Sequence, residues 1–464
     1  MWVEIAVVLC PALTRGGLTF GCHRRLASAR SRSRARCQWH PFLLLLLIAG
    51  CSCGREAGEP QKVEDYGKLP GLEATRDPVL IDEYARVKEQ GGTPEQLDDT
   101  DVKDIDNAAA VLIGQIAKGR IDPLLDHVES LFPPGEFVFD AKTMQHAAAL
   151  VRQWDEQRRA VREALARPEC DLGIEYTAGY AADVKIVDIV RILARLEAFA
   201  IAEHLADNHL KSAIDTLDIY FRLVDCLAQS PHLDARLHAA YLRTDGFRIL
   251  AAIVTRPSID RSQVERLYKI VQRQLDNWPE DARAWIGERA LGLHAYEMVR
   301  DGKVLDLMTV EEMEAFEKDK LDKSLVANTR QTVDADEAFY MQAMRQVIES
   351  CEKPYHERQK ILKQINLELQ KRWDSPEYPV VAGRLLLKDL ERAQLVQARD
   401  RANAEAWALA LTAALGAPPP EFKLSPVTGK PYRVQRKEDR IEVSGIGDAA
   451  GKQIPVWVPV MNGL

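Results

Sequence analysis

The sequence has few of the patterns that identify an enzyme or a metal protein. It contains eight cysteines and ten histidines in 464 residues, and none of them form a C-x-x-C pair or another zinc spacing. His204 and His209 are five residues apart and would diverge on a helix, whereas two metal-binding histidines need a spacing of three or four. The serine-hydrolase motif G-x-S-x-G is also missing. We therefore predict no metal site, no cofactor and no catalytic residues, and we favour a protein that is not an enzyme.

Long hydrophobic runs and surplus positive charge are missing too. The most apolar run, residues 42–49, has about eight residues, whereas a membrane-spanning helix needs roughly 20. The chain has 62 basic and 70 acidic residues, which gives a net charge of −8. Because no stripe of basic residues stands out after residue 50, this balance argues against a nucleic-acid partner of the body. It also argues against electrostatic binding to anionic lipid.

The N-terminal region has the order of an export signal. A block without acidic residues precedes the apolar run, small residues follow it, and then comes Cys51. The segment Leu47-Ile48-Ala49-Gly50-Cys51 resembles the lipobox of bacterial lipoproteins. That resemblance implies that Cys51 carries lipid on its sulfur, that a signal peptidase recognises Leu47, Ile48, Ala49 and Gly50, and that it cuts before Cys51. The basic block consists of Arg24, Arg25, Arg30, Arg32, Arg34 and Arg36.

The resemblance divides the first part of the chain into a signal and a tether. Residues 1–50 form the export signal, and because the signal begins late we expect translation to start near residue 20. Acyl chains such as palmitate on Cys51 would anchor the protein, since each buried methylene contributes about 0.8 kcal/mol and two chains hold firmly. Residues 51–77 then provide the lipidated cysteine and a polar, flexible tether. The non-acidic Ser52 favours the outer membrane over the inner one, on the periplasmic face.

Residues 78–415 are expected to form a helical body. The stretch 182–205 is apolar nearly all round, which is typical of a central buried helix. Short polar connections with proline predict antiparallel helix pairs, arranged as a compact multi-helix bundle or as an irregular α-solenoid. No repeat period is evident. Helical spacing also predicts helices near 102–116, 142–166, 209–229, 232–254, 260–276, 334–350, 354–373 and 380–415.

Residues 416–464 change character and are expected to form a small β-rich unit. Alternating segments at 432–435, 440–443 and 454–458 predict three short strands. Residues 425–434, SPVTGKPYRV, resemble a P-x-T-G-K-P motif of uncharacterised bacterial envelope proteins. Those proteins pair a long helical body with a β unit that is similar to the C-terminal part of type II secretion pseudopilins. In this chain Pro426 and Gly429 would shape a turn. The segment 444–449 holds one aspartate, too few oxygen ligands for calcium.

Large aromatic residues are predicted to lie mainly in the core, because they dominate buried helix packing. If the body has a groove, we expect Trp278 and Trp285 at its rim, since they flank a helix start. Cys226 and Cys351 lie on apolar helical faces, so buried thiols are favoured over disulfides.

Two functions remain open at the level of sequence. The first is a membrane-tethered, non-catalytic interaction or scaffold lipoprotein of the cell envelope, with an envelope protein, such as a component of secretion or pilus machinery, as its partner. The second is an envelope enzyme whose site is assembled from dispersed residues. A deep pocket with carboxylates, or His204 with a shifted pKa, would favour the enzyme. A shallow groove or an exposed apolar patch would favour the interaction protein.

Overall fold

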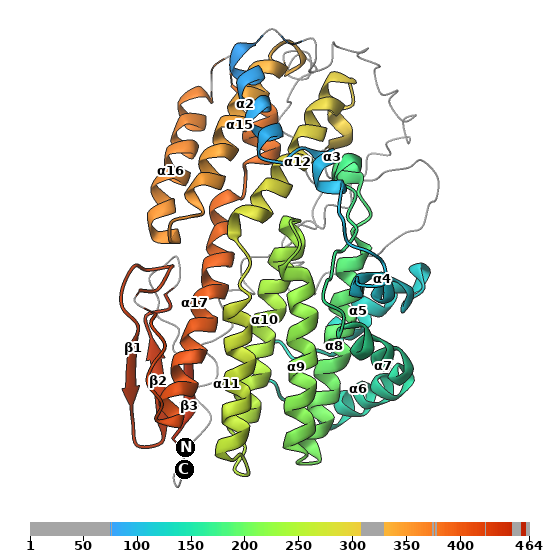
Figure 1. The fold of residues 1–464 in the computed structure, drawn as a ribbon, viewed down its shortest axis with the longest axis vertical. Helices are drawn as coiled ribbons and strands as arrows, with labels where there is room; N and C mark the ends of the chain where they lie inside the picture. Colours follow the sequence, from blue (N-terminus) through green and yellow to red (C-terminus); the bar gives the residue numbers. More distant parts are fainter. Residues whose placement is uncertain are drawn as a thin grey trace, which may run out of the picture.

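The computed structural model describes residues 75, 77–307, 329–373, 375, 378–422, 424–447 and 456–460. Within them the protein is mainly α-helical with one small antiparallel sheet near the C-terminus (Figure 1), which confirms the predicted fold class. The predicted export signal and the predicted tether apart from its residues 75 and 77, including Leu47–Cys51, lie outside the described residues.

The helices fall into an N-terminal group of short helices and a set of long ones. The short helices are α2 (Pro78–Glu89), α3 (Pro94–Asp98), α4 (Ala108–Gly114), α5 (Ile121–Leu131), α6 (Ala141–Gln153) and α7 (Asp155–Ala164). The long helices are α8 (Lys185–Ala206), α9 (Leu210–Ala228), α10 (Leu233–Val254), α11 (Arg261–Asp276), α12 (Asp281–Arg300), α15 (Val333–Ser350), α16 (Tyr355–Arg372) and α17 (Leu390–Leu415). Single turns of 3-10 or π helix link them at η3 (Lys118–Arg120), η4 (Tyr176–Ala181), η5 (Val304–Leu307) and η6 (Ala382–Leu386).

Helices α8, α9 and α10 form the centre of the body. Sixteen of the 22 residues of α8 are buried, as its nearly uniform apolar sequence predicts. Consecutive members pack on each other as antiparallel neighbours, and α17 returns from the end of the chain to pack on α10 and α11 (Figure 1). In a solenoid each unit contacts only its neighbours in sequence. The return of α17 therefore gives the body the packing of a bundle.

Three helix predictions differ from the structure. The stretch 380–415 is a continuous α-helix only from Leu390, after the π turn at Ala382–Leu386. The stretch 102–116 is helical only from Ala108, because the Asn107 side chain accepts a hydrogen bond from the Ala109 amide and caps the helix there. The same side chain binds the backbone of Asp171, which holds residues 100–107 in an irregular path. The stretch 142–166 is two helices, because the backbone leaves helical geometry at Trp154.

The sheet has the order β1–β2–β3 and consists of β1 (Arg433–Arg436), β2 (Arg440–Ser444) and β3 (Val456–Pro459). Val434 pairs with Val443, and Glu442 pairs with Trp457. Strands β2 and β3 cover α17, and β1 lies at the outer edge (Figure 1). The inward residues Ile441, Val443, Val456 and Val458 are buried. The alternation of residue types that the sequence predicts therefore corresponds to side chains that point in turn to the two faces of the sheet.

The SPVTG segment forms a compact turn that joins the sheet to α16. The buried Ser425 hydroxyl accepts hydrogen bonds from the amides of Val427 and Thr428 and donates one to the Ile446 carbonyl. Gly429 has a φ of 66°, and a side chain there would meet the His356 ring. The His356 amide donates to the Pro426 carbonyl at 3.1 Å. This turn fixes the sheet on the helical body.

Candidate functional site

Ion pairs between helices are the most distinctive feature of the interior. The Arg243 guanidinium, from α10, contacts the Asp400 carboxylate of α17, and both side chains are buried. Arg243 also donates to Gln274 of α11 at 3.1 Å, and Gln274 donates to Asp225 of α9 at 2.7 Å. Burial raises the pKa of Asp400 to about 6, although Arg243 acts in the opposite direction. These contacts hold four helices in one arrangement.

A second buried cluster joins α12 to α15. The Arg300 guanidinium lies 2.7 Å from the Glu337 carboxylate, and both side chains are almost fully buried. The neighbouring Asp336 accepts hydrogen bonds from the Tyr296 hydroxyl at 2.6 Å and from the Ala382 amide at 2.9 Å. Burial raises the pKa of Asp336 to about 6 and that of Glu337 to about 7. Asp336 thereby ties α15 to the π turn that precedes α17.

The raised pKa of Glu337 predicts a measurable pH dependence of stability. The folded protein holds this proton up to pH about 7, whereas the unfolded chain releases it near pH 4.3. Stability from the protonated form is therefore present at low pH and lost as pH rises through this window. Relative to Glu337→Gln, the wild type is expected to lose about 3 kcal/mol of unfolding free energy between pH 4.5 and pH 7. Urea unfolding at stepped pH measures the difference.

Glu297 provides the matched control, because it contacts the same Arg300 but is half exposed. Glu297→Gln is expected to change the unfolding free energy by less than about 1 kcal/mol at every pH. The unfolding free energies of the wild type and Glu337→Gln could instead differ by a constant amount between pH 4.5 and pH 7. That result would contradict the assignment of the buried proton to Glu337.

Two further clusters of buried charge follow the same pattern. On α7 and α8, Arg158 and Arg162 both donate to Glu197, at 2.9 and 2.8 Å. Asp281 accepts from Arg358 at 2.9 Å and pairs with Arg236 at 3.4 Å. All these pairs join segments that are far apart in the sequence. Apart from Asp225 and Asp336, which accept hydrogen bonds from uncharged groups, the carboxylates of these clusters pair with guanidinium groups, so we interpret the clusters as supports of the bundle.

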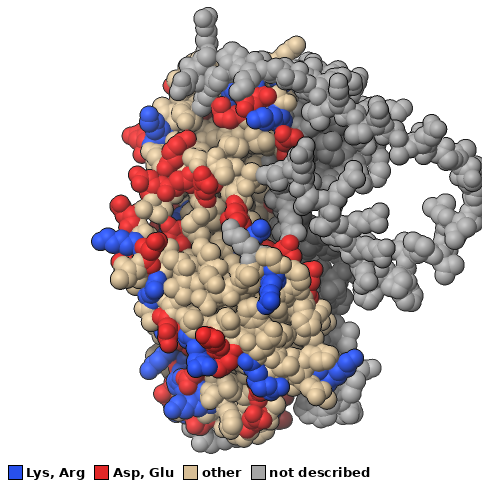
Figure 2. Space-filling model, turned by 90° about the vertical axis from the view of Figure 1, so that its right-hand side faces the viewer, with Lys and Arg blue, Asp and Glu red and all other residues tan. Residues whose placement is uncertain are grey.

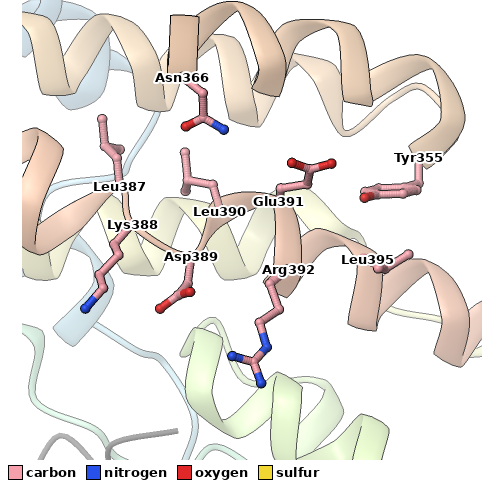
Figure 3. Close-up of a pocket in the computed structure, with 9 residues that line it drawn as sticks. All are labelled: Tyr355, Asn366, Leu387, Lys388, Asp389, Leu390, Glu391, Arg392 and Leu395. Atoms are coloured by element: carbon pink, nitrogen blue, oxygen red, sulfur yellow. The ribbon is translucent and has the colours of Figure 1, made fainter. Parts of the chain in front are cut away.

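A hollow of about 310 Å³ opens between α16 and the start of α17 (Figure 3). Its wall combines apolar and polar side chains. Figure 3 shows the Glu391 carboxylate and the Tyr355 phenol turned toward the space between the two helices, and Lys388 and Arg392 directed to the other side. Burial raises the pKa of Tyr355, and the nearby Glu391 adds to this effect. The lining residues are Tyr355, Asn366, Leu387, Lys388, Asp389, Leu390, Glu391, Arg392 and Leu395.

The hollow has the chemistry of a binding surface. Tyr355 is buried and keeps its proton, so its hydroxyl can donate or accept one hydrogen bond. Glu391 can accept hydrogen bonds, and Leu387, Leu390 and Leu395 provide apolar contact. The described residues contain no group of three or more histidine, cysteine, aspartate or glutamate side chains that could hold a metal ion.

The two tryptophans expected at a groove rim lie elsewhere and differ from each other. Trp285 is 1% exposed, and its indole N–H donates to the Gln397 side chain at 3.1 Å. Trp285 is therefore part of the core and cannot form a rim. Trp278 is partly buried beneath two guanidinium groups, those of Arg243 at 4.6 Å and Arg401 at 5.1 Å from its ring. Neither tryptophan lines the hollow.

The histidine and cysteine positions noted in the sequence are scattered through the body. His204 is partly buried, and burial lowers its pKa. Cys226 is buried, and Cys170, Cys226 and Cys351 all have free thiols. None of these four residues lines the hollow.

The outer strand of the sheet is the other candidate site. All four residues of β1 are exposed, and the apolar Val434 and Trp457 are each 44% exposed. Basic residues gather here although the chain as a whole is acidic. On the face shown in Figure 2, by contrast, lysine and arginine lie among aspartate and glutamate around a largely uncharged middle. The pattern R-x-x-R-K at 433–437 is the signal from which this strand could have been identified as exposed.

No protein-family model, no curated protein and no solved structure matches this chain. Among the described helices, none is both long and apolar enough to cross a membrane.

Proposed function

We propose that this chain is a lipid-tethered, non-catalytic interaction protein of the bacterial cell envelope. The lipobox-like segment ending at Cys51 supports the tether, and the acidic body leaves the acyl chains as the means of attachment. The protein would lie on the periplasmic side, with the outer membrane favoured. Its partner would be another envelope protein, for which the secretion or pilus machinery is the leading class.

The observation that carries the interaction is the position of β1. The inner strands of the sheet are packed on α17, and the Ser425 turn attaches the sheet to α16. A rigid support thus presents an exposed strand at the side of the body (Figure 1). Exposed strand edges with free backbone groups are a common recognition mode.

Photo-crosslinking in cell envelopes tests the proposal. A photoreactive amino acid replaces Gln435 on β1 or, as the matched control, Gln145 on α6; both side chains are exposed. We expect an adduct with one envelope protein from position 435 and none from position 145. Cys51→Ala should move the protein out of the membrane fraction and lower the adduct yield at least about tenfold, because tethering raises the local concentration.

Two outcomes would contradict the proposal. One is an equal pattern of adducts from positions 435 and 145, or none from either, while the protein is present in the membrane fraction. The other is a Cys51→Ala protein that stays with the membrane as the wild type does, because attachment would then not depend on lipid at this cysteine.

A further inference from the structure

Among the described residues, one side of the β1 backbone has no strand paired with it. The Lys437 amide donates to the Arg440 carbonyl at 2.8 Å, which makes Lys437 and Arg440 a hydrogen-bonded pair. Hydrogen-bonded and non-hydrogen-bonded pairs alternate along an antiparallel ladder. Gln435 and Arg433 therefore also bond to β2, whereas Val434 and Arg436 direct their N–H and C=O groups away from it. Within the part of the chain that the structure describes, β1 pairs only with β2.

The side chains along this edge carry unpaired positive charge. Lys437 contacts Glu442, and Arg440 lies 3.9 Å from Asp439, so those charges are matched. Arg433 and Arg436 have no ion-pair partner among the described residues, and both are exposed. Arg436 lies on the same face of the strand as Val434, whose apolar side chain is 44% exposed, and Arg433 lies on the opposite face. The free edge therefore offers the backbone N–H and C=O groups of Val434 and Arg436. It also offers the positive charges of Arg433 and Arg436 and the apolar side chain of Val434.

We propose that β1 binds an acidic, extended segment of a partner protein, which adds to the sheet as a fourth strand. This inference rests on the proposed function and names the chemistry of its partner. Backbone groups of the segment would pair with Val434 and Arg436 and supply affinity, as in other cases of strand addition. Aspartate or glutamate side chains of the segment would pair with Arg433 and Arg436 and supply the choice of partner.

The same charges argue against a second copy of this chain as the occupant. Two β1 strands that paired in antiparallel fashion would place basic side chains opposite one another, and like charges at such positions destabilise a sheet. Charged side chains on an edge strand also hinder pairing with other strands in general. The basic side chains of β1 would instead attract an acidic segment.

The test uses the full chain and two synthetic peptides. One has glutamate at two positions three residues apart, to lie opposite Arg433 and Arg436 on the two faces of the strand, with threonine or valine at its other five positions, and the other peptide has lysine in place of each glutamate. Amide hydrogen exchange, followed by NMR, reports on each residue of β1. The acidic peptide is expected to slow exchange at Val434 and Arg436, whose amides face the free edge, with little change at Gln435. The lysine peptide is expected to have no effect.

Two variants make the result specific. Val434→Pro removes one amide on the free side and leaves the β1–β2 ladder in place, because proline is tolerated where the amide faces solvent; Val434→Thr is its control. Val434→Pro is expected to weaken binding of the acidic peptide about tenfold. Arg433→Glu combined with Arg436→Glu is expected to reverse the preference toward the lysine peptide, and this variant does not depend on the backbone change.

Equal binding of the two peptides, binding that Val434→Pro leaves unchanged, or no binding of either peptide would overturn the acidic-strand proposal. A crosslink from position 435 in cell envelopes together with any of these results would leave the interaction function standing. The absence of that crosslink together with selective binding of the acidic peptide would instead count against the envelope partner alone.

Discussion

Replacing Asp400 with alanine is expected to lower the free energy of unfolding by about 3–5 kcal/mol, because it leaves a buried guanidinium without its counter-charge. Arg243 is 2% exposed, so water cannot replace the lost carboxylate. Its remaining direct contacts, the Gln274 side chain and the Trp278 ring, are uncharged, and the nearby Asp225 is separated from it by Gln274. Asp400→Asn keeps one acceptor oxygen and is expected to lose less. Chemical denaturation at neutral pH measures both variants.

The matched control for this prediction is an exposed pair in the same body. Arg261 and Glu265 lie 3.1 Å apart on α11, with both side chains about half exposed. Glu265→Ala is expected to cost less than about 0.5 kcal/mol, as is usual for such pairs. If Asp400→Ala cost no more than Glu265→Ala, the Arg243–Asp400 contact would not be the support that joins α10 to α17.

Replacing Trp285 with alanine is expected to cost about 3–5 kcal/mol of unfolding free energy, the usual range for a fully buried aromatic side chain. The loss includes a cavity inside the bundle and an unpaired Gln397 side chain, which now accepts from the indole at 3.1 Å. Trp278→Ala, at a partly buried site, is expected to cost about 1–2 kcal/mol. The two tryptophans flank the same helix start, so the pair isolates the effect of burial.

Thermal or urea unfolding of the two tryptophan variants provides the comparison. Tryptophan fluorescence adds a second readout, since, of these two tryptophans, only Trp285 donates to a side chain within the core. Equal losses in the two variants would show that Trp285 is not the core residue that its 1% exposure indicates.

The fold class could be predicted because local signals agreed with tertiary structure. The nearly uniform apolar sequence of α8 indicated a buried helix, and 16 of its residues are buried. The alternating sequences of β2 and β3 indicated strands, and these strands pack on α17. Errors arose where a side chain acted on the backbone at a distance. Asn107 binds Asp171, 64 residues away, and stops the helix that periodicity had placed across 102–116.

The candidate sites were less accessible to sequence reasoning. Arg243 and Asp400 are 157 residues apart, and neither periodicity nor motif spacing links them. Trp285 and Trp278 look alike in sequence, and only the packing of α17 separates a core residue from a partly buried one. The edge strand was within reach, because its alternation predicted a strand and its unusual content of arginine and lysine is typical of an exposed edge.

Lipid on Cys51 is the central claim of this account, and mass spectrometry of the mature N-terminal peptide from cell envelopes tests it most directly. We predict that the mature chain begins at Cys51 and that this residue carries the mass of a diacylglyceryl group. A mature chain that begins elsewhere, or an unmodified Cys51 in membrane-bound protein, would contradict it.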